Sequence, residues 1–277
     1  MSILKNKASI IQFFNEKVDR YNQPSFIASD PVCIPHLFKK KQDIEIAALF
    51  AAVFAWGNRT TIINKSKELL QLMDLAPYDF CVNHQDKDLK KLLQFKHRTF
   101  NATDLLYFIS FLKFHYQSNK SLESAFFPVH NPNLQTALLL VSFPNLEKDH
   151  RVEQALIHFH QYFFSLEDAP NRTRKHIATP YKNSSCKRLN MFLRWMVRND
   201  QKGVDFGIWK RISPADLICP IDVHVARVAK RFQLLDRKQV DWTAALELTS
   251  WLRTLDPLDP VKYDFALFGL GVMEKYT

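Results

Sequence analysis

The sequence predicts an all-α protein, and three observations favour this class. Only five of the 277 residues are glycine, whereas average proteins contain roughly 7%. Tight hairpin turns and barrel corners need glycine, so a many-stranded β-fold is disfavoured. Apolar residues recur at helical spacing along most of the chain. Hydrophobic residues make up 47% of the sequence and include 23 phenylalanines, which is ample for a packed core.

The first half of the chain contains a series of helical patterns separated by proline or glycine. The apolar run 44–56 is hydrophobic on nearly all sides, so we expect this helix to be buried. Gly57-Asn58-Arg59 ends it, and Thr60 or Thr61 is expected to cap the next helix. The helices predicted in this half cover 4–21, 44–56, 60–72, 101–116, 133–141 and 149–165.

The middle of the chain carries a strong positive charge. Between Asn171 and Arg198 there are eight cations and no acid, within a chain of net charge +10 and pI near 9.4. Such a run is a solvated face, a phosphate-binding surface, or a contact surface for a protein or an anionic ligand, and the absence of acids favours phosphate binding. The cations are Arg172, Arg174, Lys175, Lys182, Lys187, Arg188, Arg194 and Arg198.

The last third begins with a helix predicted over 186–198, for which Asn183, Ser184 and Ser185 are candidate N-caps. Residues 201–209 form a loop or a short extended piece. Pro220 followed by Asp222 indicates the start of another helix. Further helices are predicted near 242–254 and 260–275, where Gly269-x-Gly271 indicates close helix packing or the floor of a pocket.

The composition also excludes several classes of function. Glycines at 57, 203, 207, 269 and 271 form neither a dinucleotide-binding motif nor a P-loop. The four cysteines form no C-x-x-C pair, so we expect no iron–sulfur cluster, no metal and no other cofactor. Because no apolar stretch approaches ~18 residues and no signal peptide is present, we expect no membrane association and a cytoplasmic location.

One segment resembles a known superfamily. Pro220-Ile-Asp222-Val-His224-Val-Ala-Arg-Val-Ala-Lys-Arg231 is similar to the Pro-Val-Asp-x-His-x-x-Arg-Val-x-x-Arg signature of helix-hairpin-helix DNA glycosylases, which include endonuclease III and the 8-oxoguanine glycosylases. The resemblance implies that Lys187 is a nucleophile and that Asp222 assists it as a proton-transfer group or an electrostatic partner. Without this resemblance, the sequence would indicate only that Asp222 caps a helix and that Lys187 is a solvated lysine. The phrases 187–198 and 262–271 also resemble a bacterial family of unknown function.

The resemblance further implies contacts with duplex DNA that holds one flipped, damaged base. The superfamily's Gly-x-Gly hairpin is replaced here by Lys182-Asn183-Ser184-Ser185, so phosphate must be held in another way, through helix N-terminal amides and hydroxyl groups. The interval of 35 residues between Lys187 and Asp222 implies an insertion between the two helices. The candidate DNA-binding residues are Asn58, Arg59, Ser184, Ser185, Arg188, Arg194 and His224.

Taken together, these features predict a two-domain, helix-hairpin-helix glycosylase-like architecture with a cleft between the domains. A central helical domain, 41–184, is inserted into a discontinuous terminal domain made of 1–40 and 185–277. The predicted function is excision of a damaged base in base excision repair, with or without AP lyase activity. Two alternatives stay open: a non-catalytic nucleic-acid-binding protein on the same scaffold, and a helical scaffold for protein partners.

Overall fold

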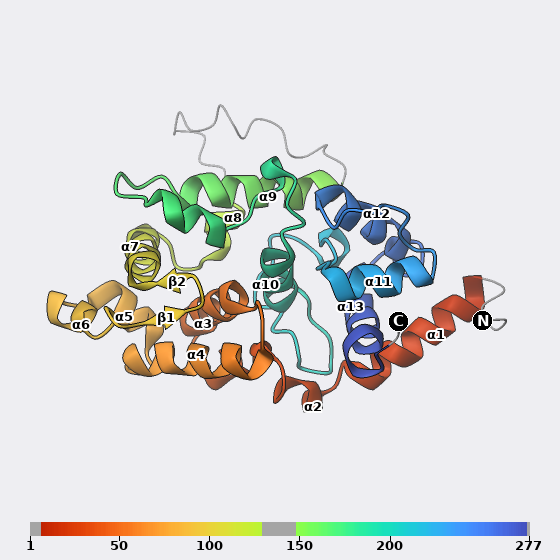
Figure 1. Ribbon diagram of the computed structural model, residues 1–277, viewed down its shortest axis with the longest axis horizontal. Coiled ribbons are helices and arrows are strands. Elements are labelled where there is room, and N and C mark those ends of the chain that lie inside the picture. The colour runs from red at the N-terminus through yellow and green to blue at the C-terminus, as the bar shows by residue number, and fades with distance from the viewer. Residues whose placement is uncertain (1–6, 129–147, 276–277) are drawn as a thin grey trace. The chain divides into compact units, whose positions relative to one another are not determined.

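The computed structural model describes residues 7–128 and 148–275, and these residues are mostly helical (Figure 1). Within them, the β structure is limited to one two-stranded antiparallel sheet and an isolated bridge. The all-α prediction is therefore confirmed. The helix predicted over 133–141 lies outside the described residues. In the described part of the chain, no helix is long and apolar enough to cross a membrane.

The chain divides into two compact units: a terminal unit of residues 1–28 and 180–277, and a central unit of residues 29–179. Both boundaries between the units, after residues 28 and 179, fall earlier in the sequence than predicted, since we expected them after residues 40 and 184. Residues 29–40 belong to the central unit because two short turns, η1 (Pro31–Cys33) and η2 (Pro35–Leu37), pack against its first long helix.

The described part of the central unit consists mainly of helices, with one small hairpin. Its first helix, α3, is buried along almost its entire length, as the apolar pattern predicted. The elements are α3 (Lys41–Phe54), α4 (Arg59–Leu72), α5 (Pro77–Asn83), α6 (Asp86–Lys90), β1 (Lys96–His97), β2 (Phe100–Asn101), α7 (Ala102–Ser118), α8 (Glu123–Phe126), α9 (Lys148–Phe163) and η4 (Asn171–His176).

A completely buried acid, Glu45, connects the helices of this core. Glu45 on α3 is completely buried, and its carboxylate accepts hydrogen bonds from Tyr116 Oη at 2.9 Å, Leu122 N at 2.9 Å and Ser121 Oγ at 2.5 Å. A buried carboxylate is tolerated when its oxygens are hydrogen-bonded in this way. Glu45 therefore links α3 to the end of α7 and the segment that follows.

The terminal unit is built from both ends of the chain. Its α10 covers the helix predicted over 186–198, and residues 201–209 form an irregular loop as expected. The elements are α1 (Lys7–Tyr21), α2 (Pro24–Ile27), η5 (Pro180–Lys182), α10 (Lys187–Val197), η6 (Pro214–Asp216), α11 (Val223–Arg231), α12 (Trp242–Arg253), η7 (Pro260–Lys262), α13 (Tyr263–Phe268) and the π-helical turn η8 (Gly269–Met273).

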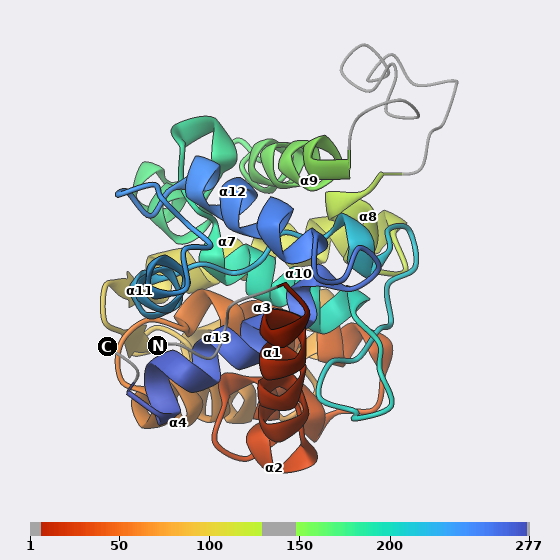
Figure 2. The same ribbon diagram turned by 90° about the vertical axis from the view of Figure 1, so that its right-hand side faces the viewer.

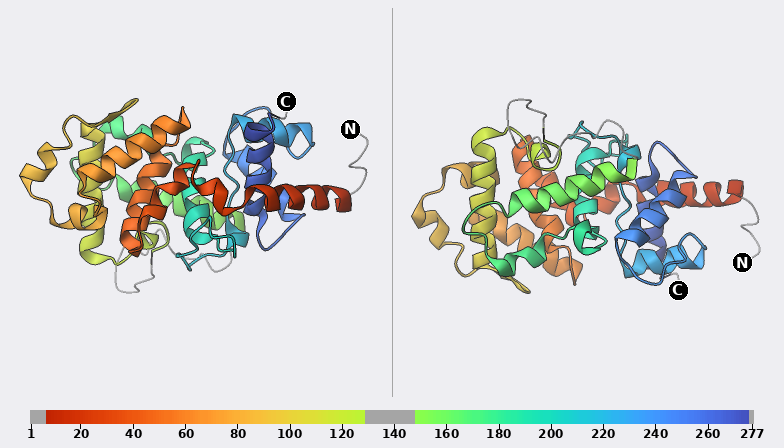
Figure 3. Two further views of the ribbon diagram at one scale, coloured as in Figure 1. Left: turned by 90° about the horizontal axis from the view of Figure 1, so that it is seen from below. Right: turned by 90° about the horizontal axis from the view of Figure 1, so that it is seen from above.

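Two glycines allow the helices of this unit to approach closely. α1 packs against α13, as Figure 2 shows, and a Cβ atom at Gly269 would lie 2.2 Å from the Tyr21 ring. A Cβ atom at Gly271 would lie 3.2 Å from the carbonyl oxygen of His224 on α11, the helix that packs beside α13 (Figure 3). Of the two predicted roles, close helix packing is the one confirmed for Gly269-x-Gly271.

Candidate functional site

The structure brings Lys187 and Asp222 together within the terminal unit. Lys187 is the first residue of α10, and Asp222 is the N-cap of α11. Lys187 Nζ lies 3.8 Å from Asp222 Oδ2, and the two side chains are 26% and 27% exposed. An amine and a carboxylate that are close together and open to solvent can exchange a proton and still reach a ligand.

The two carboxylate oxygens of Asp222 have different environments. Oδ1 accepts hydrogen bonds from the backbone amides of His224 at 2.9 Å and Val225 at 3.0 Å, which is ordinary N-capping. Oδ2 is the atom nearest the Lys187 amine. The capping role and the proposed catalytic role are therefore compatible, because the backbone amides occupy only one oxygen.

The turn that precedes Lys187 is formed without glycine. Asn183 and Cys186 adopt left-handed backbone conformations with φ of 54° and 50°. Asparagine is among the residues that accept this conformation most readily, whereas cysteine is not. Cys186 is buried, and burial raises the pKa of its thiol to about 12. The thiol beside Lys187 therefore stays protonated and is a poor nucleophile.

Side chains hold this turn in place. Asn183 Nδ2 donates to Asp241 Oδ2 at 3.1 Å, and Asn190 Nδ2 donates to the Ser185 carbonyl at 3.0 Å. Ser184 also forms a β-bridge with Asp241. These bonds fix residues 183–185 against the start of α12 and the first turn of α10.

Asp264 on α13 is a buried carboxylate that the sequence did not single out. It is 6% exposed and pairs with Arg194 Nη1. Burial raises the pKa of Asp264 to about 6, and the charges of Arg194 and Lys187 oppose that rise. Asp264 is thus within electrostatic reach of the Lys187–Asp222 pair.

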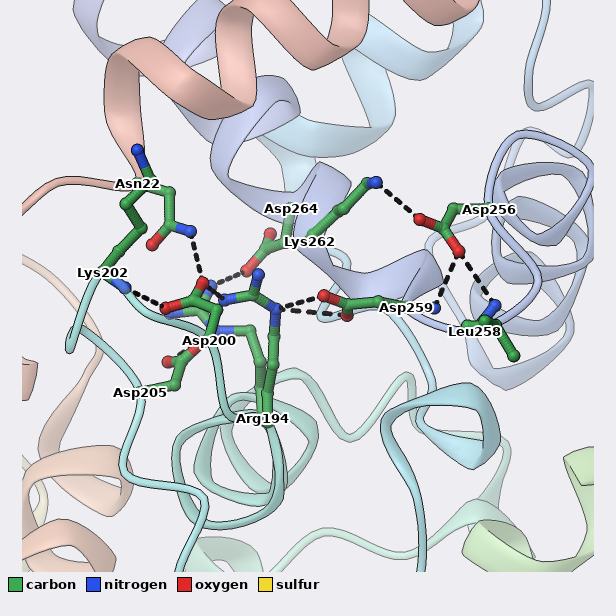
Figure 4. A network of polar contacts seen from close by, with 11 residues as sticks. Asn22, Arg194, Asp200, Lys202, Asp205, Asp256, Leu258, Asp259, Lys262 and Asp264 are labelled. Carbon is green, nitrogen blue, oxygen red and sulfur yellow. Dashed lines mark hydrogen bonds and ion pairs between the residues drawn. The ribbon is translucent and has the colours of Figure 1, made fainter.

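Arg194 was predicted to contact DNA, and that prediction is wrong for this conformation. Arg194 is 4% exposed, and its guanidinium pairs with Asp205 at 3.3 Å and with Asp264, as Figure 4 shows. A side chain that is buried and already paired with two carboxylates cannot bind a phosphate at the surface.

The positive run 171–198 is also less uniform than its composition suggested. Arg198 is buried and pairs with Asp200 at 2.6 Å and Asp205 at 3.0 Å. Burial lowers the pKa of Arg198, and the charges of Asp205, Asp259 and Asp200 outweigh this effect and raise it. Arg172 lies 3.1 Å from the buried Asp104. The acids come from outside the run, so several of its cations are neutralised within the fold.

The other candidates in the terminal unit lie at or near the Lys187–Asp222 pair. Ser184 Oγ accepts from the Cys186 amide at 3.3 Å, and Ser185 Oγ donates to the Ile221 carbonyl at 3.4 Å. Both hydroxyl groups therefore help to shape the turn. Arg188 is half-buried, and burial lowers its pKa. His224 is exposed.

Three further cations on α11 were missed as candidates. Arg227, Lys230 and Arg231 are exposed on the side of α11 opposite its buried valines, and Arg227 Nη2 lies 3.2 Å from His224 Nδ1. The helical spacing of these residues around Val225 and Val228 is a signal that could have identified them.

Asn58 and Arg59 lie in the central unit. Asn58, rather than Thr60 or Thr61, is the N-cap of α4, and its Oδ1 accepts from the Thr61 amide at 3.1 Å. Arg59, the first residue of α4, is half-buried. Arg98, which the sequence did not single out, stacks over Trp56 with its guanidinium 4.7 Å from the ring centroid. The central unit thus presents a polar turn with a nearby cation.

Within the described residues, no group of three or more histidine, cysteine or acidic side chains is arranged to hold a metal ion. The four cysteines form no disulfide. The family described as protein of unknown function DUF2400 matches residues 30–273. No curated protein and no solved structure matches the chain significantly.

Proposed function

The chain belongs to the DUF2400 family, and from its site we propose that it is a DNA glycosylase that excises a damaged base. The observation that carries this proposal is the 3.8 Å separation of Lys187 Nζ and Asp222 Oδ2 at the starts of two helices. The same two residues are those that the resemblance to helix-hairpin-helix glycosylases selects. The substrate would be duplex DNA with one nucleotide flipped out of the stack, because C1′ is inaccessible inside it.

In the proposed reaction, Lys187 attacks C1′ of the damaged nucleotide as a neutral amine. The proton of its ammonium form passes to Asp222 Oδ2, whose partner oxygen stays engaged in capping. A new N–C1′ bond forms while the bond to the base breaks, and the departing base takes that electron pair and the proton held by Asp222. Asp222 then removes a proton from the new secondary ammonium and passes it to O4′ as the C1′–O4′ bond breaks. The nitrogen lone pair completes a cationic Schiff base on Lys187, which either hydrolyses or permits strand cleavage.

The surface around the pair supports a polyanionic substrate. His224 and Arg227 are exposed at the start of α11, and Lys230 and Arg231 follow one turn later. The positive end of the α11 dipole also lies at Asp222. We propose that these side chains contact backbone phosphates, which contribute affinity without sequence preference. Contact of Asn58 and Arg59 with the duplex is part of the same proposal.

Borohydride trapping tests the catalytic proposal directly. Wild-type protein is incubated with duplexes that carry an AP site or a panel of damaged bases, and the Schiff base is reduced to a stable adduct. We expect an adduct that disappears in Lys187→Ala. Lys182→Ala removes an exposed lysine five residues earlier and should leave trapping unchanged. An adduct that persists in Lys187→Ala would contradict the assignment of the nucleophile.

A non-catalytic nucleic-acid-binding protein is the second candidate, and the exposed cations of α11 favour it independently of Lys187. This second candidate would be preferred if no duplex is trapped or cleaved but the affinity for duplex DNA falls steeply with added salt. In either case we expect Arg227→Ala to make the slope of log K for DNA binding against log salt concentration less steep by about 0.9, the value for one phosphate contact. An unchanged slope would exclude Arg227 from the DNA interface, and a chain that binds no nucleic acid would support a scaffold for protein partners.

A further inference from the structure

The hairpin of the central unit places an arginine in a backbone conformation that usually belongs to glycine. β1 and β2 pair through His97 and Phe100, so Arg98 and Thr99 form the turn between them. Arg98 has φ of 55°, and the first position of such a turn normally carries glycine or asparagine when its φ is positive. Positive φ is strained for an ordinary residue with a Cβ atom. Glycine would relieve this strain, but it would also remove the side chain.

The Arg98 side chain is held between an aromatic ring and a glycine. Its Cζ lies 4.7 Å from the centroid of the Trp56 ring, within the range of a cation–π interaction. A Cβ atom at Gly57 would lie only 2.4 Å from Arg98 Nη1, so the guanidinium occupies the space that this glycine leaves open. The guanidinium is therefore fixed from two directions before any ligand binds.

Contacts with the core fix the hairpin beside the Trp56 ring. His97 is 2% exposed, and its Nε2 lies 3.1 Å from the Phe54 carbonyl at the end of α3. The His97 ring also meets the Trp56 ring edge to face. On the other side of the turn, Arg172 Nη2 donates to the Thr99 carbonyl at 3.0 Å. The tip of the hairpin is thus held by the packed part of the central unit.

The tip of the hairpin carries positive charge at the surface. Lys96 and Arg98 are exposed, and the Arg172 side chain is 37% exposed; these three residues are the hairpin cations. Among the residues that the structure describes, no acid forms an ion pair with Lys96 or Arg98. Asp104 pairs with Arg172 at 3.1 Å but is completely buried, so it brings no negative charge to the surface. The hairpin cations differ in this respect from the buried arginines of α10, which acids of other segments neutralise.

We propose that the hairpin cations form a further contact with nucleic acid, in which the Arg98 guanidinium binds a backbone phosphate and Trp56 is its positioning residue. This inference rests on the DNA-binding part of the proposed function and not on its chemistry. A guanidinium over a ring keeps its N–H groups at the edge of its plane, where two of them match two phosphate oxygens. Because the side chain is already fixed, binding loses less conformational entropy than it would with a mobile arginine. Several cations at one surface favour a chain of phosphates over a single phosphate.

Binding of the full chain to a duplex with a stable AP-site analogue, measured by fluorescence anisotropy over a range of salt concentrations, tests this contact. We expect Arg98→Gln to weaken binding about eightfold at ~0.1 M salt and to make the slope of log K against log salt concentration less steep by about 0.9, as for one lost phosphate contact. Arg98→Lys keeps the charge but not the planar fork, so its slope should stay that of wild type and its affinity should fall by less. An Arg98→Gln protein with the affinity and slope of wild type would overturn the inference.

Arg174→Gln is the matched control. Arg174 also lies over a ring in the central unit, with its Cζ 4.8 Å from the Phe164 centroid, but it is half-buried. Its loss removes the same charge from the protein, so any long-range electrostatic effect is matched. The slope of Arg174→Gln should equal that of wild type. A change in slope as large as that of Arg98→Gln would show a general effect of charge and would overturn the assignment of a local contact.

Trp56→Leu tests whether the indole acts through Arg98. We expect this substitution to weaken DNA binding about threefold in the wild-type background and to have no effect in the Arg98→Gln background, because residues that act through one contact are not additive. Equal losses in the two backgrounds would overturn the positioning role. Circular dichroism checks the fold of each variant. The main measurement does not depend on Trp56→Leu, since Arg98→Gln changes only an exposed side chain.

Inorganic phosphate is the second probe, and it distinguishes a nucleic-acid contact from a site for free phosphate. The Nε–H signal of Arg98 in ¹⁵N nuclear magnetic resonance is assigned by its loss in Arg98→Gln. We expect duplex DNA to shift this signal at concentrations at which inorganic phosphate leaves it unchanged. A signal that responds to inorganic phosphate at lower concentrations than to the duplex would overturn the assignment to nucleic acid.

Borohydride trapping separates this inference from the glycosylase proposal. If Arg98→Gln weakens duplex binding as stated but no duplex is trapped by wild type, the contact stands and the glycosylase proposal fails. If wild type traps a duplex that Arg98→Gln binds equally well, the glycosylase proposal stands and the contact at Arg98 is refuted. A chain that binds no duplex would overturn both.

Discussion

Replacing Asp241, the N-cap of α12, with asparagine removes one negative charge beside the turn before Lys187 while keeping the size of the side chain. Asp241 Oδ2 accepts from Asn183 Nδ2 at 3.1 Å and from Arg237 Nη2 at 2.5 Å, and Oδ1 caps α12 through the Ala244 amide at 3.0 Å. Asparagine is an equally good N-cap. The substitution therefore tests the charge rather than the cap.

The expected magnitude follows from the pKa of Asp241. The Arg237 side chain is the first cause that lowers this pKa, from 3.8 to about 2, and a difference of about two units corresponds to about 2.5 kcal/mol. Because Arg237 is 34% exposed, solvent screening reduces the effect to about 1–2 kcal/mol. A carboxylate with a depressed pKa stabilises the fold above pH 4, and this contribution disappears as the pH falls towards 2.

Urea unfolding between pH 6 and pH 2.5 measures this effect. We expect Asp241→Asn to be less stable than wild type by about 1–2 kcal/mol at pH 6, with a difference that shrinks steadily below pH 4. Asp236→Asn changes an exposed acid nearby and should shift stability by less than about 0.5 kcal/mol. A difference that stays constant across the pH range would refute the electrostatic reasoning.

Two further substitutions probe packing and buried charge. Gly269→Ala places a Cβ atom 2.2 Å from the Tyr21 ring, so urea unfolding should show a decrease of about 2–3 kcal/mol in the free energy of unfolding from overpacking. A decrease under about 1 kcal/mol would mean that the ring can move aside. Arg198→Met leaves Asp205 buried without one of its partners and should cost about 3–5 kcal/mol. Its control, Arg20→Met, breaks an exposed pair with Glu274 and should lower the free energy of unfolding by less than about 1 kcal/mol. If Arg198→Met and Arg20→Met were equally destabilising, the role of burial would be refuted.

Most of the helices could be predicted because apolar periodicity reports directly on which side of a helix is buried. The fully apolar pattern of 44–56 corresponds to the buried α3, and the stripe after Asp222 corresponds to α11. Helix starts were harder to predict. Asn58, Thr60 and Thr61 all suit an N-cap, and only the fold determines which side chain meets a free amide. The short turns η1 and η2 depend on packing against α3 and leave no periodic signal.

The candidate site was predictable only in part. The approach of Lys187 to Asp222 spans 35 residues and followed from the resemblance, since spacing alone implies no such contact. The burial of Arg194 could not be predicted, because its partner Asp264 lies 70 residues away in the sequence. A run without acids is read as a positive surface only while the acids of other segments are ignored. Long-range pairing therefore accounts for the main error in assigning surface cations.

The absence of glycine from the turn before Lys187 has a structural explanation. Glycine is used in such turns because it adopts positive φ without steric cost, and here Asn183 and Cys186 adopt positive φ instead. That conformation costs roughly 1–2 kcal/mol per residue, so it requires compensation. Asn183 bonds to Asp241, and Asn190 bonds to the Ser185 carbonyl. Because side chains rather than glycines hold the turn, the position of Lys187 depends on Asp241 and Asn190, and a loss of either should move the amine away from Asp222.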